Sequence, residues 1–408
     1  MKIETVRLGL YAERLLVAFA SGIFLTLPLY FKLQGQNEVF FGQIYAAGAI
    51  GALLFVSIGA RLVRKFGLRK IAPLGSGLFA LGSACYFFAA TSGASTWAYA
   101  AASLIQGAGW GLLFTLGPIC MSSTVKGNDH AHFFTMYAAY STLGMGAAPI
   151  FAKFVTLRHA MSFATLFATA AAISLLACCL AAYVAWNNTF YERIKQAPSL
   201  SGLKEFKKIM KLPSGYFFAM VLCGACVYSV LINLQTTLAA AQHLDYTVFY
   251  ACYSLAVVAS RFVLSKPLGK LKPAVSIKWL MVLTIAALGL MLEAGQSAIC
   301  YGVAASLLGL GYGLLYPIVQ AQAAVHAPDH LRPQTLVYFS LIYFAAMYLC
   351  PCLGAAVAVA YGYGALLAVL IAVALLELLL VLYFYRVPAR QLNRLRFPDA
   401  AGSASDVY

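Results

Sequence analysis

The chain has 408 residues, of which 62% are hydrophobic and only 10% are charged, and its mean hydropathy is +0.84. Soluble domains carry roughly 25% charged residues, so this composition excludes an ordinary soluble protein and predicts one that spans a membrane. The formal net charge of +16 also raises nucleic-acid binding as an alternative, which the distribution of the charges disfavours.

Twelve apolar blocks follow one another along the chain, each close to the roughly 20 residues that cross a bilayer. They cover residues 8–31, 41–63, 71–91, 97–121, 132–154, 161–186, 215–240, 245–265, 275–294, 297–324, 335–360 and 364–385. Backbone amides in hydrocarbon must be satisfied within one segment, and the alternating pattern of barrel strands is absent. The sequence therefore predicts an all-α membrane protein with twelve transmembrane helices. The first block is too long for a cleavable signal.

The basic residues are distributed unevenly across the predicted membrane. All 28 of them except Lys32, Lys153 and Arg158 fall in the tails, the even-numbered connections or the adjoining helix ends. By the positive-inside rule both termini then face the cytoplasm, and the excess charge contacts anionic lipid headgroups. We expect an integral multi-pass protein of a bacterial inner membrane, without nucleic acid as a partner.

Two segments repeat each other at an offset of 202 residues. Residues 107–114 read GAGWGLLF and residues 309–316 read GLGYGLLY, and the same offset carries Pro149 onto Pro351. Internal duplication predicts two six-helix bundles related by a pseudo-two-fold axis, and transporters of this kind bind substrate between the repeats. The glycines four residues apart favour close helix packing.

The duplication divides the chain into an N-terminal bundle at 1–186, a linker at 187–213, a C-terminal bundle at 214–386 and a cytoplasmic tail at 387–408. Within the linker, Leu203, Phe206, Ile209 and Met210 oppose a set of lysines at helical spacing. This pattern predicts either a short helix on the inner membrane surface or a solvated linker with one charged face.

The connection after the second block carries a family resemblance. Residues 60–70 read ARLVRKFGLRK, which resembles the G-x-L-x-D-R-x-G-R-K motif of the major facilitator superfamily. Gly67, Arg69 and Lys70 match this motif, whereas Arg64 occupies its acidic position, so the charged lock that the acidic residue forms in the family is in doubt here. Gln106 and Gly107 match part of a second element, R-x-x-Q-G.

The resemblance implies alternating access by two six-helix bundles around a central cavity. In this family the first, fourth, seventh and tenth helices line the cavity, with contributions from the second, fifth, eighth and eleventh. It also implies gating roles for the motif residues Arg64, Gly67, Arg69 and Lys70. We add Arg261, which lies near the inner end of the eighth block.

Ionisable residues inside the membrane are costly and indicate function. Glu13 is a candidate proton carrier, and Arg14 could attract an anionic substrate, although both could instead reach the inner headgroups. Glu377 in the last block is a second candidate for proton coupling. Neutral polar and aromatic side chains at helical spacing complete the predicted substrate site. These are Gln43, Gln106, Tyr140, Asn233, Tyr253, Tyr312, Tyr316 and Gln320.

The sequence contains no phosphate-binding loop, metal-binding motif or nucleophile with an in-membrane base, so we predict a transporter that is not an enzyme and needs no cofactor. All ten cysteines fall inside the apolar blocks and are expected to be free thiols. Protons are the expected coupling ion, and the protein is expected to act as a monomer.

The first functional prediction is proton-coupled efflux, by antiport, of a small amphiphilic organic molecule, either drug-like or a secreted metabolite such as a siderophore. The alternative is proton symport of an organic anion or sugar into the cell, which is favoured if Arg14 and Arg261 reach the cavity. A third possibility, a sensor or scaffold without transport, is disfavoured because the chain has no soluble domain larger than the linker.

Overall fold

The computed structural model describes residues 3–93, 95–122, 124, 130–158, 161–187, 191, 203–264, 271–295 and 297–386. The predicted tail at 387–408 and linker residues 188–190 and 192–202 lie outside the described residues. The helices are α1 (Ile3–Ile23), the 3-10 turn η1 (Phe24–Thr26), α2 (Leu27–Leu33), α3 (Glu38–Phe66), α4 (Leu68–Ser92), α5 (Thr96–Ser122), α6 (His130–Arg158), α7 (Phe163–Trp186), α8 (Leu203–Met210), α9 (Ser214–Ala241), α10 (Tyr246–Val263), α12 (Pro273–Glu293), α13 (Ala298–Val325), the 3-10 turn η3 (Asp329–Leu331) and α14 (Arg332–Arg386).

The helical prediction is confirmed. Ten helical segments in the described part of the chain are long and apolar enough to cross a membrane, and α1, η1 and α2 together form the first of them. The last of the ten, α14, joins the eleventh and twelfth predicted spans across Gly362, whose φ of 83° turns the chain. The fifth predicted span is α6, a helix of 29 residues.

Local sequence fixes where several helices begin and end. The Asn37 side chain accepts a hydrogen bond from the Phe40 amide at 3.1 Å and so caps the start of α3. Gly67, one of the motif residues, separates α3 from α4 with a φ of 82°, a conformation that side chains with a Cβ rarely adopt. The positive φ at the junction of α3 and α4 therefore explains why the motif has a glycine at position 67.

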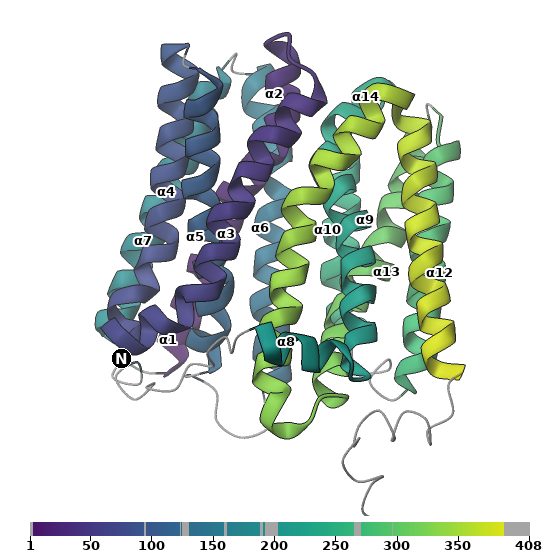
Figure 1. Cartoon of the computed structure of the whole chain (residues 1–408). Helices are drawn as coiled ribbons and strands as arrows, with labels where there is room; N and C mark the ends of the chain where they lie inside the picture. Colours follow the sequence, from purple (N-terminus) through teal and green to yellow (C-terminus); the bar gives the residue numbers. More distant parts are fainter. Residues whose placement is uncertain are drawn as a thin grey trace, which may run out of the picture.

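The helices form two bundles, α1 to α7 and α9 to α14, as the duplication predicts (Figure 1). The bundles meet along two seams, one between α3 and α14 and the other between α6 and α10. We refer to the two ends of the molecule as the α8 end, which holds the N-terminus and α8, and the α2 end opposite it (Figure 1).

The repeated glycines pack equivalent helix pairs in the two bundles. A Cβ on Gly107 or Gly111 of α5 would collide with the backbone of α3, at Gly48 and Ala52. In the second copy, a Cβ on Gly309 of α13 would lie 2.6 Å from a carbonyl oxygen of α10. Each repeat thus uses missing side chains to bring one cavity-lining helix against its neighbour.

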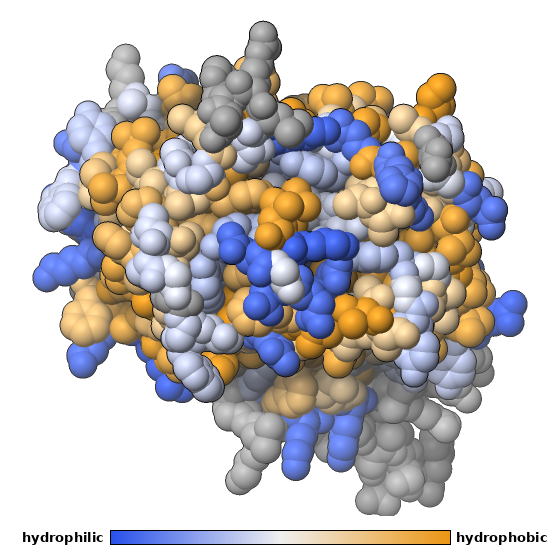
Figure 2. All heavy atoms as spheres, turned by 90° about the horizontal axis from the view of Figure 1, so that it is seen from above, coloured by the Kyte–Doolittle hydropathy of each residue, from blue (hydrophilic) through white to orange (hydrophobic). Residues whose placement is uncertain are grey.

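At the α2 end the bundles are joined by polar contacts. The Tyr363 hydroxyl donates to Glu38 Oε1 at 2.8 Å, and Lys153 Nζ lies 2.7 Å from Asp245 Oδ2. One contact lies on each seam, since Glu38 belongs to α3 and Lys153 to α6. Figure 2 views this end, where hydrophilic side chains gather near the middle of the face.

The linker contains the predicted short helix, α8, which packs against protein. Ile209 is fully buried, and the Phe206 ring lies 5.0 Å from the ring of Tyr338 in α14. Lys207 and Lys208 on the opposite face are exposed. The apolar face of α8 is therefore covered at least in part by the C-terminal bundle, which ties the linker to a cavity-lining helix.

Candidate substrate cavity

A cavity of about 710 Å³ lies between the two bundles. Its volume falls within the roughly 300–1,000 Å³ of small-molecule sites. Side chains of α1, α3, α5 and α6 line it from one bundle and those of α9, α10, α13 and α14 from the other, which are the helices that the family resemblance implied. The lining reaches the exposed residues Arg332 and Pro333, so the cavity opens toward the α8 end.

Most of the predicted substrate-site residues line this cavity. They are Arg14, Gln106, Asn233, Tyr253, Tyr312, Tyr316 and Gln320, and Arg261 joins them. Two others lie elsewhere: Gln43 is exposed on α3, and the Tyr140 ring stacks on Tyr11 at a centroid distance of 5.1 Å outside the lining. Helical spacing identified residues that share a face without identifying what that face contacts.

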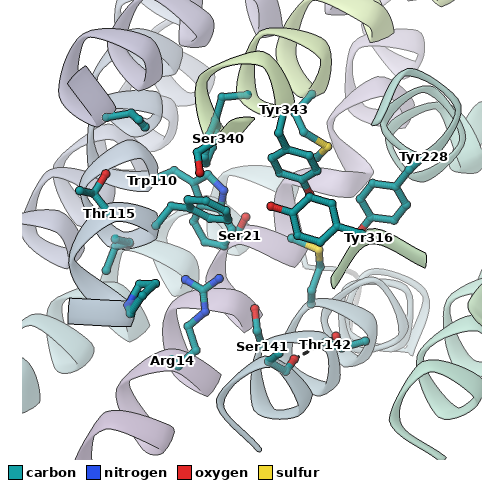
Figure 3. Close-up of a pocket in the computed structure, with 18 of the residues that line it drawn as sticks. Arg14, Ser21, Trp110, Thr115, Ser141, Thr142, Tyr228, Tyr316, Ser340 and Tyr343 are labelled. Atoms are coloured by element: carbon teal, nitrogen blue, oxygen red, sulfur yellow. Dashed lines mark hydrogen bonds between the residues drawn. The ribbon is translucent and has the colours of Figure 1, made fainter. Parts of the chain in front are cut away.

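Arg14 of α1 is the dominant polar group of the site. Its guanidinium points into the space between Trp110 and Tyr316 (Figure 3). It lies 4.9 Å from the Trp110 ring centroid and 5.3 Å from that of Tyr137, which are cation–π distances. The side chain is only 8% exposed, and its Nε and Nη1 find no hydrogen-bond acceptor in the described part of the chain. A buried charge without an acceptor is costly and predicts an anionic ligand.

Arg261 of α10 approaches the cavity from the second bundle. Its Nη1 donates to the Thr142 hydroxyl of α6 at 3.3 Å, so this contact crosses the seam between the bundles. Unlike Arg14, Arg261 therefore already has a partner in this conformation. Breaking that contact would be part of any separation of α6 from α10.

Aromatic side chains form the walls of the cavity. Tyr228 and Tyr312 stack with ring centroids 4.5 Å apart. Tyr343 of α14 contacts Tyr316 at 4.7 Å and Phe114, from the other bundle, at 5.9 Å. The hydroxyls of Tyr312 and Tyr316 are buried and have no hydrogen-bond partner among the described residues. The walls thus combine apolar ring faces with hydroxyls available to a ligand.

The charged side chains in the described lining of the cavity are all positive. Its described lining includes three arginines, Arg14, Arg261 and Arg332, and neither aspartate nor glutamate. The nearest relevant carboxyl is Glu13, which is 6% exposed and faces the interior of the first bundle, where it accepts a hydrogen bond from the Ser76 hydroxyl at 2.7 Å. Consecutive residues on an α-helix point about 100° apart, so Glu13 faces Ser76 of α4 while Arg14 faces the cavity.

The other predicted functional residues lie apart from the cavity. Glu377 is buried within the C-terminal bundle. Arg64 and Lys70 are exposed near the junction of α3 and α4, and Arg69 donates to the Trp186 carbonyl of α7 at 2.8 Å. The motif therefore joins helices at the α8 end without contributing to the cavity.

Several cavity residues were missed in the sequence. Trp110, Tyr228 and Tyr343 line the cavity. Only Trp110 stands in a sequence pattern from which its place in the cavity could have been predicted. It occupies the position in the first repeat that Tyr312 occupies in the second, so the offset of 202 residues could have identified it. Tyr228 and Tyr343 lie in continuous apolar runs where no periodicity distinguishes the cavity face.

A family model for the Major Facilitator Superfamily matches residues 14–344. The fold resembles the crystal structure of the human organic anion transporter MFSD10 (TETRAN), with 14% identity and a TM-score of 0.70 over 93% of this chain and all of that one. It also resembles a mutant of the nucleoside transporter NupG, with 13% identity, a TM-score of 0.72 and the same coverage. No curated protein matches the sequence.

Proposed function

The chain belongs to the major facilitator superfamily, and on that premise we propose that it carries a small amphiphilic organic anion across the membrane together with a proton. It is a multi-pass membrane transporter rather than an enzyme. The observation that carries the anion assignment is the charge of the cavity: its described lining holds arginines without any carboxylate, and Nε and Nη1 of Arg14 find no acceptor among the described residues. The fold is also similar to that of an organic anion transporter.

The aromatic walls support a ligand with a substantial apolar part. The rings of Tyr228, Tyr312 and Tyr343 offer flat apolar faces, while the free hydroxyls of Tyr312 and Tyr316 can donate to an oxygen of the substrate. An aromatic carboxylate or sulfonate would place its acidic group on Arg14 and its ring between the tyrosines.

Because Glu13 and Arg14 are adjacent, anion binding and proton binding can be coupled, and the coupling favours movement of both in the same direction. The guanidinium favours the ionised form of the neighbouring carboxyl, and an anion bound to Arg14 cancels that effect. Anion binding and protonation of Glu13 therefore favour each other, with a coupling of about 1–3 kcal/mol that is typical of linked sites. Ligands that favour each other's binding travel together, which is symport.

The same reasoning favours symport over the proton-coupled efflux that was the first functional prediction from the sequence. Antiport requires that substrate and proton compete, which a cation at this site would do and an anion would not. Inward movement of an anion against an inside-negative potential costs about 2.3 kcal/mol per 100 mV, and one proton moving with it cancels the charge. Arg14 and Arg261 both reach the cavity, the condition under which we favoured anion uptake.

We further propose that both termini face the cytoplasm of a bacterial inner membrane, so that the cavity opens inward in this conformation. The exposed Lys207 and Lys208 of α8 would then lie at the anionic headgroups. The transporter would act as a monomer, since both of the bundles that line the cavity belong to the same chain.

Transport by the purified protein in proteoliposomes tests this function. The probes are radiolabelled benzoate, salicylate and naphthalene-2-sulfonate, with benzamide as the uncharged counterpart of benzoate, under an inward proton gradient. We expect accumulation of at least one aryl anion that collapses when a protonophore is added, and none of benzamide. Failure of all three anions, or movement of an anion only against the proton flow, would overturn the proposal.

A further inference from the structure

Glu377 is a buried carboxyl that the mechanism above does not use. It lies in the second half of α14, is 3% exposed, and forms neither a hydrogen bond nor an ion pair with any residue that the structure describes. Glu13, by contrast, accepts a hydrogen bond from Ser76. The packing of α14 alone does not explain an acidic side chain at this position, because an apolar residue would fill the same space without the cost of burying a polar group.

The carboxyl of Glu377 lies one layer of side chains behind the cavity. A Cβ placed on Gly224 of α9 would lie 3.1 Å from Glu377 Oε2 and 3.4 Å from Cε2 of Tyr312. Gly224 therefore leaves open the space between the carboxyl and a tyrosine that lines the cavity. The Tyr312 hydroxyl is itself without a partner among the described residues, so rotation of this one ring would connect Glu377 with the cavity.

Among the residues that the structure describes, the groups around Glu377 include no cation that could hold it ionised. Cys223 faces it from α9 and Tyr312 from α13, and both are neutral. The α12 helix carries Lys278 and Glu293, neither of which interacts with it. An ionised carboxylate is strongly disfavoured in such surroundings unless a cation, a donor or water reaches it.

We propose that Glu377 is a second proton-binding site, which holds a proton in the conformation described here and releases it in the alternate one. The inference rests on the proposed function for the first proton, which we assign to Glu13. One anion would then move with two protons, and each cycle would carry one net positive charge in the direction of the protons. Uptake would be driven by the membrane potential as well as by the pH gradient.

The number of protons linked to the conformational change can be measured without a substrate. Dyes attached through noncanonical amino acids at positions 61 and 272, both exposed at the α8 end, report opening and closing of the cavity by energy transfer. Each proton that is bound in one conformation and released in the other changes the equilibrium constant by about tenfold per pH unit. Without an anion the guanidinium of Arg14 keeps favouring the ionised form of Glu13, so we expect Glu377 alone to contribute and the wild type to show a slope of about tenfold per pH unit.

Matched variants show which residues produce the pH dependence of the conformational equilibrium. Glu377→Gln should abolish the pH dependence of the equilibrium, and Glu377→Asp, which keeps a carboxyl, should retain the wild-type slope. Glu293→Gln, at an exposed carboxyl, is the control for removing a charge. A wild-type slope in Glu377→Gln would overturn the inference. Glu13→Gln should keep the wild-type slope, because the first proton site responds to the anion. Loss of the slope in this variant would assign it to Glu13 and would also overturn the inference.

Discussion

Replacement of Arg14 by Gln should change stability and affinity in opposite directions. In the free protein the guanidinium is buried with two of its nitrogens unpaired, and desolvation of such a charge costs several kcal/mol. Its contacts with Trp110 and Tyr137, at 4.9 and 5.3 Å, return about 0.5–2 kcal/mol each. The neutral amide should therefore raise the melting temperature of the ligand-free protein, by an amount equivalent to about 1–2 kcal/mol.

The same change should weaken anion binding strongly. Hydrogen bonds to charged groups contribute about 1.5–3 kcal/mol each, so losing two of them costs about 3–6 kcal/mol. This corresponds to a reduction in affinity of about 10²- to 10⁴-fold. Uncharged amide counterparts of the same aryl compounds should show no such reduction.

Thermal unfolding in detergent, with and without the aryl anions, measures both effects in one series. Arg64→Gln, at an exposed arginine outside the cavity, is the matched control and should change neither quantity. The reasoning would be refuted if Arg14→Gln lowered the melting temperature of the free protein and left the stabilisation by anions unchanged, because Arg14 would then be a structural residue.

Three further predictions follow from the site and the seams. Glu13→Gln should lower the accumulation driven by a pH gradient by about tenfold per pH unit of gradient while exchange of labelled for unlabelled anion continues, and accumulation equal to that of the wild type would exclude Glu13 as a proton carrier. Tyr316→Ala and Gln320→Ala should each weaken anion binding by about 1–3 kcal/mol in a titration, and unaltered affinity in both would reject the assignment of these side chains to the site. Burial alone would raise the pKa of Asp245, but the hydrogen bonds from Lys153 and Thr247 outweigh it and hold the pKa below its usual value. The ion pair therefore stabilises the closed α2 end fully at any pH above the usual aspartate pKa near 3.9, and this stabilisation is lost as the pH falls through the lowered pKa. Asp245→Asn removes the ion pair at neutral pH, so spin-label distance measurements should show that the α2 end opens.

The fold could be predicted because hydropathy and charge placement report directly on the bilayer. The span expected at 132–154, for example, is the core of α6, whose helix extends from His130 to Arg158. The site could be predicted only where chemistry restricts a residue. Arg14 is such a case, because a charge within a membrane span needs a reason, whereas Gln43 can face outward at little cost and does so.

The remainder of the site depends on how helices rotate against each other, which the sequence does not encode locally. Tyr140 and Ser141 are neighbours on α6, yet only Ser141 lines the cavity. The orientation of α6 is set by close contacts between bundles: a Cβ on Gly146 would lie 2.5 Å from the Cβ of Ser254 in α10. Such a contact links residues more than 100 positions apart, so no pattern within either helix reveals it.

The duplicated segments explain how one cavity acquires two chemically different halves. Phe114 and Tyr316 are equivalent by the offset of 202 residues, and both contact Tyr343, from opposite bundles. The glycines of each copy preserve the scaffold, while the aromatic position differs by a hydroxyl that only the second copy carries. The first bundle instead supplies Arg14, whose Nε and Nη1 have no acceptor in the described part of the chain. A substrate that bridges the bundles is therefore held with its acidic group toward the first and its hydrogen-bond-accepting part toward the second. It follows that Tyr316→Phe should change the relative affinities of anions that carry the same charge but different ring substituents. Arg14→Gln should instead change the relative affinities of charged and uncharged ligands that share the same ring.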